Sequence, residues 1–133
     1  MPGIDECLLE AMRLPGARGA ALVDWTSGLA LGIVGEFPGG DPEIAATESA
    51  ELARLATEQR AFTPDPSSTP SPSDAPPITD LIITNPDSYH LLHFLPTSLD
   101  TTAFLHICLT RHEGNLALTR IRLEELARKL VLA

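Results

Sequence analysis

Histidine and cysteine residues are the side chains of this sequence best suited to catalysis or metal binding. His106 and Cys108 lie two residues apart in a strand-like segment, so their side chains share one face and could form half of a metal site. His90 and His93 point to opposite faces of another strand-like segment and cannot bind one ion together. A metal site would need two further ligands, for which the sequence offers no obvious source. We therefore interpret His106 and Cys108 as a buried histidine beside a buried thiol, and we predict neither a metal site nor a cofactor.

Motifs of common enzyme classes are missing from the sequence. It contains no GxxxxGK[ST], GxGxxG, GxSxG or HExxH. Arg18 and Arg111 flank strand-like segments and could be suggested as arginine fingers for a GTPase, but arginines in such places are usually solvated. We therefore predict no catalytic residues and a protein that is not an enzyme.

The charge and hydropathy of the chain exclude several partners. Its 133 residues carry a net charge of −9, and a surface of that sign repels the phosphates of nucleic acids. No apolar run approaches the roughly 20 residues that span a bilayer, and the N-terminus has no signal-peptide pattern. The two cysteines, Cys7 and Cys108, are far apart in the sequence, which favours two reduced thiols over a structural disulfide. We expect a cytoplasmic protein that binds no nucleic acid and does not insert into membranes.

The pattern of apolar residues and turn signals predicts eight elements. Asp41 can cap the second helix, Pro42 suits its first turn and Glu43 lies near the positive end of its dipole. The turn sequence NPDS separates two of the strands. In order, we expect a helix over 4–12, strands over 20–25 and 29–34, a helix from about Pro42 to about Ala61, strands over 78–84, 89–95 and 102–110, and a helix within 113–133.

A proline- and serine-rich stretch, FTPDPSSTPSPSDAPP at 62–77, separates the two halves. Neither half offers enough elements to stand alone, so we expect a single domain over 1–133 with a mobile loop at 62–77. The strands are apolar at nearly every residue, which predicts a sheet covered on both faces. The fold class is therefore α+β, with one five-stranded antiparallel sheet between helices.

The order α-β-β-α-β-β-β-α resembles the Roadblock family, which is related to the profilin-like and longin folds. Two segments carry the resemblance: GARGAALVDWTSGLALG near the first hairpin and GNLALTRIRLEELARKL at the C-terminus. Together with the order of elements they extend it over about 110 residues. Two departures are an extra residue in the hairpin turn and the long connection at 62–77.

The resemblance implies a dimer, in which the second helices of two subunits lie side by side and the third strands pair at their edges. The segment 78–84 supports this because an apolar edge strand needs a partner. We expect a stripe of small residues to contact the partner helix, while Ile44, Leu52, Leu55 and Phe62 face the sheet. The predicted dimer interface is Ala46, Ser49, Ala50, Ala53, Ala56, Ile78, Asp80, Ile82 and Thr84. The predicted contacts to another protein are Trp25, Arg54 and Glu58.

The resemblance also implies a function. Bacterial members of the family commonly act with a small Ras-like GTPase, and an arginine-rich, lysine-poor composition suggests a bacterial source. We expect a non-enzymatic homodimeric interaction module that binds and regulates, or scaffolds, such a GTPase. Two alternatives stay open: a purely structural scaffold in a signalling or motility complex, and a small-molecule or metal sensor that uses the profilin-like cavity with His106 and Cys108.

Overall fold

A single five-stranded sheet organises the chain. The computed structural model describes residues 3–65, 76–96 and 102–132, and most of the predicted mobile loop at 62–77 lies outside the described residues. The strands are β1 (Ala17–Asp24), β2 (Leu29–Gly35), β3 (Asp80–Thr84), β4 (Ser88–Phe94) and β5 (Ala103–Thr110). Their order in the sheet is β2-β1-β5-β4-β3, and all neighbouring strands are antiparallel.

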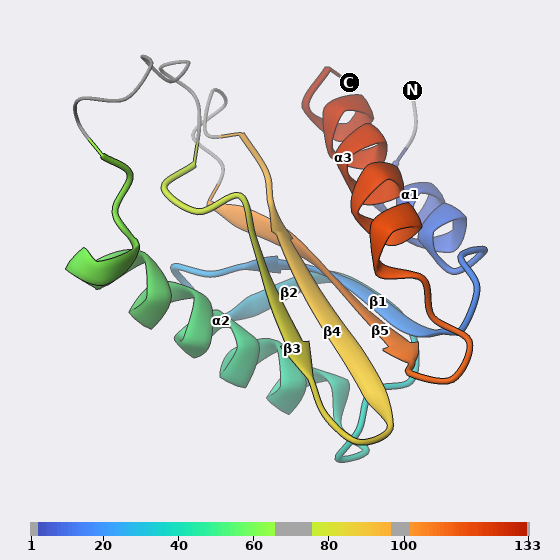
Figure 1. Ribbon diagram of the computed structural model, residues 1–133. Helices are drawn as coiled ribbons and strands as arrows, with labels where there is room; N and C mark the ends of the chain where they lie inside the picture. Colours follow the sequence, from blue (N-terminus) through green and yellow to red (C-terminus); the bar gives the residue numbers. More distant parts are fainter. Residues whose placement is uncertain (1–2, 66–75, 97–101, 133) are drawn as a thin grey trace.

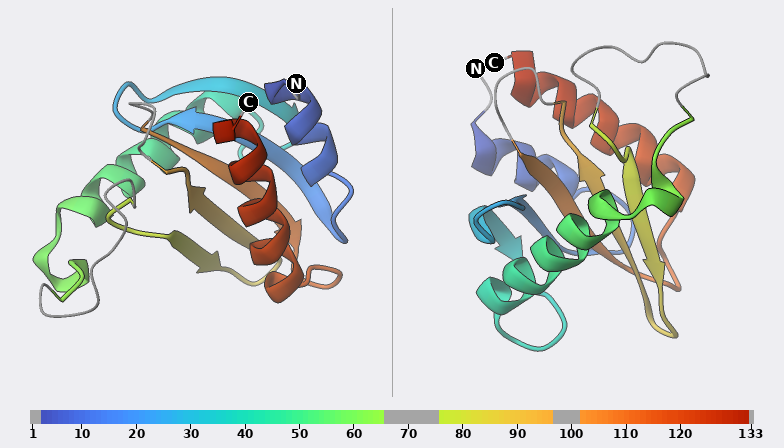
Figure 2. Two further views of the ribbon diagram at one scale, coloured as in Figure 1. Left: turned by 90° about the horizontal axis from the view of Figure 1, so that it is seen from above. Right: turned by 90° about the vertical axis from the view of Figure 1, so that its left-hand side faces the viewer.

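Helices cover both faces of this sheet (Figures 1 and 2). The helices α1 (Ile4–Ala11) and α3 (Leu116–Leu132) lie on one face, and α2 (Pro42–Glu58) lies on the other. A short 3-10 helix, η1 (Arg60–Phe62), follows α2. Alternation along each strand divides the apolar side chains between two cores, one under α1 and α3 and one under α2. The predicted α+β class, element order and two-sided covering of the sheet are confirmed.

Local sequence signals set the ends of several elements. At the start of α2, the Asp41 Oδ1 accepts a hydrogen bond from the Glu43 N–H at 3.0 Å, and Pro42 occupies the first turn. In the β3–β4 turn, the Asn85 side chain accepts hydrogen bonds from the backbone N–H groups of Asp87 and Ser88. These are the roles that the sequence predicts for Asp41 and for the NPDS turn.

The edge strands differ from the prediction of complete burial. The inner strands β1, β4 and β5 are largely buried on both faces. On β2, however, Leu29 and Leu31 are exposed, and on β3 so are Ile82 and Ile83. Apolar side chains on every residue therefore indicate burial for the inner strands, whereas the same pattern at an edge leaves apolar surface in contact with water.

The α1 helix packs closely on β2 because Gly32 has no side chain. A Cβ atom at Gly32 would lie 2.8 Å from the Ile4 side chain and 3.0 Å from that of Leu8. Gly35, at the end of β2, has φ +79°, a conformation that other residues adopt at a cost. These glycines allow α1 to lie close to the β1–β2 hairpin, on the face of the sheet opposite to α2.

Candidate interaction surface

The stripe of small residues on α2 faces the sheet, so the predicted orientation of this helix is wrong. Ala46, Ala50, Ala53 and Ala56 are buried, and Ala53 has no exposed surface. Ser49 is half-buried and donates a hydrogen bond to the Ala46 carbonyl oxygen at 3.0 Å. Because their own sheet covers them, the four alanines cannot form the predicted contact with a second subunit.

The large apolar residues of α2 lie on the outer face instead. Ile44 is 57% exposed and Leu55 is 56% exposed, and Leu52 is also accessible. Phe62, which follows in η1, is exposed as well. The apolar residues of α2 that are accessible to a partner are therefore the larger side chains and not the alanines.

The reason for this inversion is the size of the residues under the helix. The α2-side core contains bulky side chains, including Phe37, Phe94 and Phe104. Close packing then favours small residues on the helix that covers them. A signal for this was present in the sequence: Glu48, Glu51 and Glu58 lie on the same helical face as Leu55, and glutamates are seldom buried without a partner.

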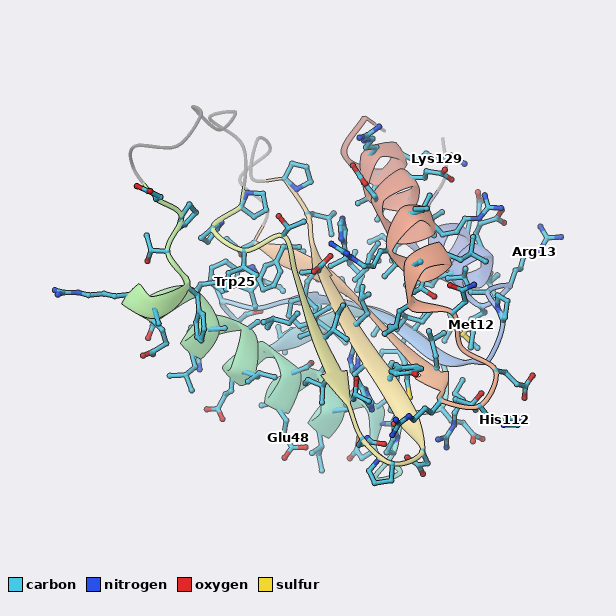
Figure 3. All side chains as sticks on the ribbon, in the orientation of Figure 1. Met12, Arg13, Trp25, Glu48, His112 and Lys129 are labelled. Carbon is cyan, nitrogen blue, oxygen red and sulfur yellow. The ribbon has the colours of Figure 1, made fainter. Side chains whose placement is uncertain are left out.

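The outer face of α2 is acidic as well as apolar. A hollow of about 500 Å³ on this face is lined by Glu48, Glu51, Leu52, Arg54, Leu55 and Glu58. Arg54 pairs with Glu51 at 3.7 Å, while Glu48 and Glu58 have no ion-pair partner among the described residues. Figure 3 shows Glu48 pointing from α2 away from the sheet. We define the acidic platform as these six residues together with Ile44.

The β3 strand is a free edge of the sheet in the described part of the chain. Ile82 is 41% exposed and Ile83 is 40% exposed, and they lie on opposite faces because side chains alternate along a strand. Asp80 is held in place by Arg120 of α3, whose Nε donates to its Oδ2 at 3.1 Å. Thr84, at the end of the strand, is exposed. Ile78 precedes the strand and packs against the α2-side core, so it does not belong to the free edge.

A second hollow joins the acidic platform to this edge. It measures about 300 Å³, and Leu52 of α2 and Ile83 of β3 both line it. At its base are two histidine side chains, His90 of β4 and His106 of β5, and Phe37 packs 4.8 Å from the His106 ring. The apolar surfaces of α2 and β3 are therefore continuous around one hollow.

The two histidines form a hydrogen-bonded pair. The His90 Nδ1 lies 2.9 Å from the His106 Nε2, and the His90 Nε2 lies 3.3 Å from Ser88 Oγ and 3.8 Å from Cys108 Sγ. Burial lowers the pKa of His106 to about 3, aided by His90, and also lowers the pKa of His90. Burial raises the pKa of the Cys108 thiol. The cluster is therefore neutral at pH 7 and internally bonded.

This cluster contains the two residues that the sequence suggested as half of a metal site. His106 and Cys108 share the α2 face of β5 as predicted, and His93 points to the opposite face from His90. Sequence reasoning missed His90 as the third member, because its contact depends on the pairing of β4 with β5. Among the described residues, no group of three or more His, Cys, Asp or Glu side chains is arranged to hold a metal ion.

Trp25, the predicted aromatic contact, lies at the end of β1. Its ring meets Phe94 edge-on at 6.2 Å, and its backbone N–H donates to the Thr102 carbonyl oxygen at 2.8 Å. It is half-buried beside the α2-side core. Packing within the subunit therefore accounts for Trp25, and a contact with another protein stays a prediction.

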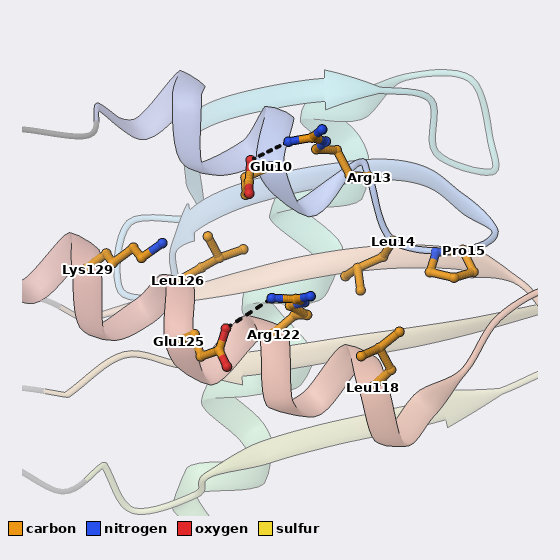
Figure 4. Close-up of a pocket in the computed structure, with 9 residues that line it drawn as sticks. All are labelled: Glu10, Arg13, Leu14, Pro15, Leu118, Arg122, Glu125, Leu126 and Lys129. Carbon is orange, nitrogen blue, oxygen red and sulfur yellow. Dashed lines mark hydrogen bonds and ion pairs between the residues drawn. The ribbon is translucent and has the colours of Figure 1, made fainter.

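A hollow of about 230 Å³ lies on the other side of the sheet, between α1 and α3 (Figure 4). Its charges are mixed: Arg13 pairs with Glu10 at 3.5 Å and Arg122 with Glu125 at 3.4 Å. Neighbouring charges there offset one another, in contrast with the acidic platform.

No helix in the described ranges is long and apolar enough to cross a membrane.

Comparisons with known proteins give a match in three dimensions. No protein-family model and no curated protein matches the sequence. Among solved structures, a Roadblock/LC7 domain from Streptomyces avermitilis has a TM-score of 0.72 at 14% identity, with 96% of this chain and 93% of that chain covered. A structure described as MglB with tetrameric arrangement has a TM-score of 0.70 at 18% identity, covering 95% and 83%. The gliding protein MglB from Thermus thermophilus has a TM-score of 0.66 at 16% identity, covering 92% and 82%. Identities this low establish the fold alone, and the chain is a Roadblock-like domain in its fold, as its sequence implied.

Proposed function

We propose that this chain is a cytoplasmic, non-enzymatic homodimer that binds a small Ras-like GTPase and regulates or scaffolds it. The observation that carries the proposal is the continuous apolar surface formed by the outer face of α2 and the free edge of β3. Large exposed apolar patches mark interaction sites in soluble proteins, and an unpaired edge strand recruits another strand. The Roadblock resemblance assigns these two elements to the subunit contact and to the platform for a GTPase.

The corrected orientation of α2 changes the residues of that contact. In the proposed dimer, Ile44, Leu52 and Leu55 lie at the junction of the two α2 helices, where the sequence had placed the alanines. The glutamates between them remain at the rim, facing the GTPase. Arg54 and Glu58 keep the partner-contact role predicted from the sequence, since both line the acidic platform.

The charge of the platform indicates what kind of GTPase surface it fits. The α2 helix has four glutamates and one arginine, and two copies side by side double this excess of negative charge. Complementary charges accelerate association and disfavour partners of like charge. The contacting surface of the GTPase is therefore basic.

The experiment has two stages. Analytical ultracentrifugation at micromolar concentration tests for the dimer, and a Leu55→Glu variant is expected to dissociate it. Calorimetric titration then compares a small GTPase encoded in the same genome in its GDP-bound and GTP-analogue-bound states. Regulation requires different affinities for the two states. Equal, measurable affinities identify a scaffold, and no binding to either state contradicts the proposal.

Charge reversal supplies a matched pair of variants for the second stage. Glu48→Lys on the platform is expected to weaken GTPase binding about 5- to 30-fold, equivalent to about 1–2 kcal/mol for a rim charge next to a basic surface. Glu6→Lys, an exposed glutamate on α1 across the sheet, should leave binding within about twofold. Equal effects of the two variants would show that only the net charge of the chain matters.

A further inference from the structure

The free edge of β3 presents the backbone groups of alternate residues. The Asn85 N–H donates to the Ser88 carbonyl oxygen at 3.0 Å, and the Phe94 N–H donates to the Thr79 carbonyl oxygen at 3.0 Å. Backbone groups alternate in direction along an antiparallel ladder, so those of the odd-numbered residues between 79 and 85 face β4. The N–H and C=O groups of Asp80, Ile82 and Thr84 therefore point away from β4, toward the free edge.

We infer that a second copy of this chain pairs with β3 in a single register. Ile82 faces Ile82 of the partner subunit on the two-fold axis, and Asp80 faces the partner subunit's Thr84. The inference rests on the homodimer of the proposed function and specifies which atoms join the two sheets.

The hydrogen-bonding pattern selects this register over its neighbours. With Ile82 on the axis, all three outward-facing residues have partners, which gives about six hydrogen bonds at two for each facing pair. A shift that puts Leu81 or Ile83 on the axis leaves one end of the strand unpaired, with about four bonds.

Larger shifts meet chemical obstacles. With Asp80 on the axis, two carboxylates face each other, and like charges directly opposite destabilise a sheet. With Thr84 on the axis, Ile82 faces Pro86 of the partner subunit, which has no N–H to donate. The register centred on Ile82 avoids both.

Side chains on both faces suit the same register. On the α3 face of the sheet, the Asp80 Oδ2 already accepts a hydrogen bond from Arg120, while its other oxygen has no hydrogen bond among the described residues. The hydroxyl of the partner subunit's Thr84 lies opposite and can donate to it. The exposed Ile82 meets its own copy, and Ile83, on the α2 side, meets the partner subunit's Leu81. The contact thus covers both exposed isoleucines.

Cysteine cross-linking tests the register directly. Facing residues of a hydrogen-bonded pair have Cα atoms about 5.5 Å apart, which a disulfide can bridge. The two Ile83 Cα atoms would be about 8 Å apart, given a rise of about 3.4 Å per residue and a strand spacing of about 4.8 Å, which is too far. Upon oxidation with copper phenanthroline, Ile82→Cys is expected to form a covalent dimer at least about tenfold faster than Ile83→Cys. The native Cys7 and Cys108 are buried and common to both variants.

A second pair protects the test against a variant that fails to fold. Asp80→Cys mixed with Thr84→Cys is expected to cross-link faster than either variant alone. Ultracentrifugation of the unmodified chain separates the two levels of the inference. A monomer contradicts the homodimer and the register together. A dimer in which Ile83→Cys cross-links faster, or in which neither pair cross-links, contradicts the register and leaves the homodimer standing.

Discussion

We predict that acid destabilises this protein because His106, in the buried histidine pair, resists protonation in the folded chain. Burial lowers the pKa of His106 from 6.5 to about 3, so the folded chain keeps this imidazole neutral where the unfolded chain would protonate it. A group with a depressed folded-state pKa contributes stability above the unfolded pKa. That contribution is lost as pH falls from about 6.5 toward about 3.

The size of the effect follows from proton linkage. One proton taken up only on unfolding lowers the free energy of unfolding by about 1.4 kcal/mol for each pH unit. Unfolded His106 is only half protonated at pH 6.5, so the loss due to His106 reaches about 2 kcal/mol over the whole range from pH 7.5 to pH 5. In a domain stabilised by about 5–15 kcal/mol, a loss of that size is easily measured.

The variant His106→Gln isolates this contribution, because glutamine does not titrate and its amide can reach the position of Nε2 next to His90. Urea unfolding of both proteins at fixed concentration, from pH 7.5 to pH 5, gives the free energy of unfolding at each pH. The advantage of the unmodified chain over the variant should shrink by about 2 kcal/mol across this range. Parallel curves would refute the reasoning, as would a His106 NMR titration centred near pH 6.5.

Three further predictions concern the orientation of α2, the end of β2 and the cap of α2. Ala53→Leu, on the sheet side of α2, should lower the free energy of unfolding by about 1–3 kcal/mol through overpacking. Leu55→Ala, on the outer side, should weaken the dimer in ultracentrifugation and leave far-UV circular dichroism unchanged. The opposite pattern would restore the helix orientation predicted from the sequence. Gly35→Ala should cost about 1–3 kcal/mol in urea unfolding because of its positive φ, and a neutral result would mean that the end of β2 relaxes freely. Asp41→Ala removes the cap of α2 and should cost about 1 kcal/mol, with Asp41→Asn nearly neutral; equal losses in both would exclude the capping bond as the cause.

Local signals predicted the elements well because their causes are local. The cap at Asp41 and the turn at Asn85 act through hydrogen bonds within three residues, so they can be recognised without a fold. The end of α2 was less accurate: the sequence predicts helix to about Ala61, while the helix ends at Glu58 because Gln59 has an extended backbone. The edge strand likewise begins at Asp80 and not at residue 78.

The candidate site was harder to predict because it depends on contacts between distant segments. Which face of α2 meets the sheet depends on the volume of Phe94 and Phe104, about fifty residues further along the chain. The His90–His106 contact depends on the register of β4 against β5. Hydrophobicity alone ranks leucine above alanine for burial, whereas the fold selects by size and by the position of the neighbouring glutamates.

The place of β1 in the sheet has a consequence for biosynthesis. One neighbour of β1 follows within a few residues, but the other is β5, so that Ala20 pairs with Ile107. During synthesis the β1–β2 hairpin can form early, but the edge of β1 that pairs with β5 stays unpaired until nearly all of the remaining sequence has been made. Such distant pairings slow folding, because the entropy of a long loop is lost before any contact compensates it. Chains that end before β5 should therefore expose the inner edge of this hairpin and aggregate more readily than the full chain.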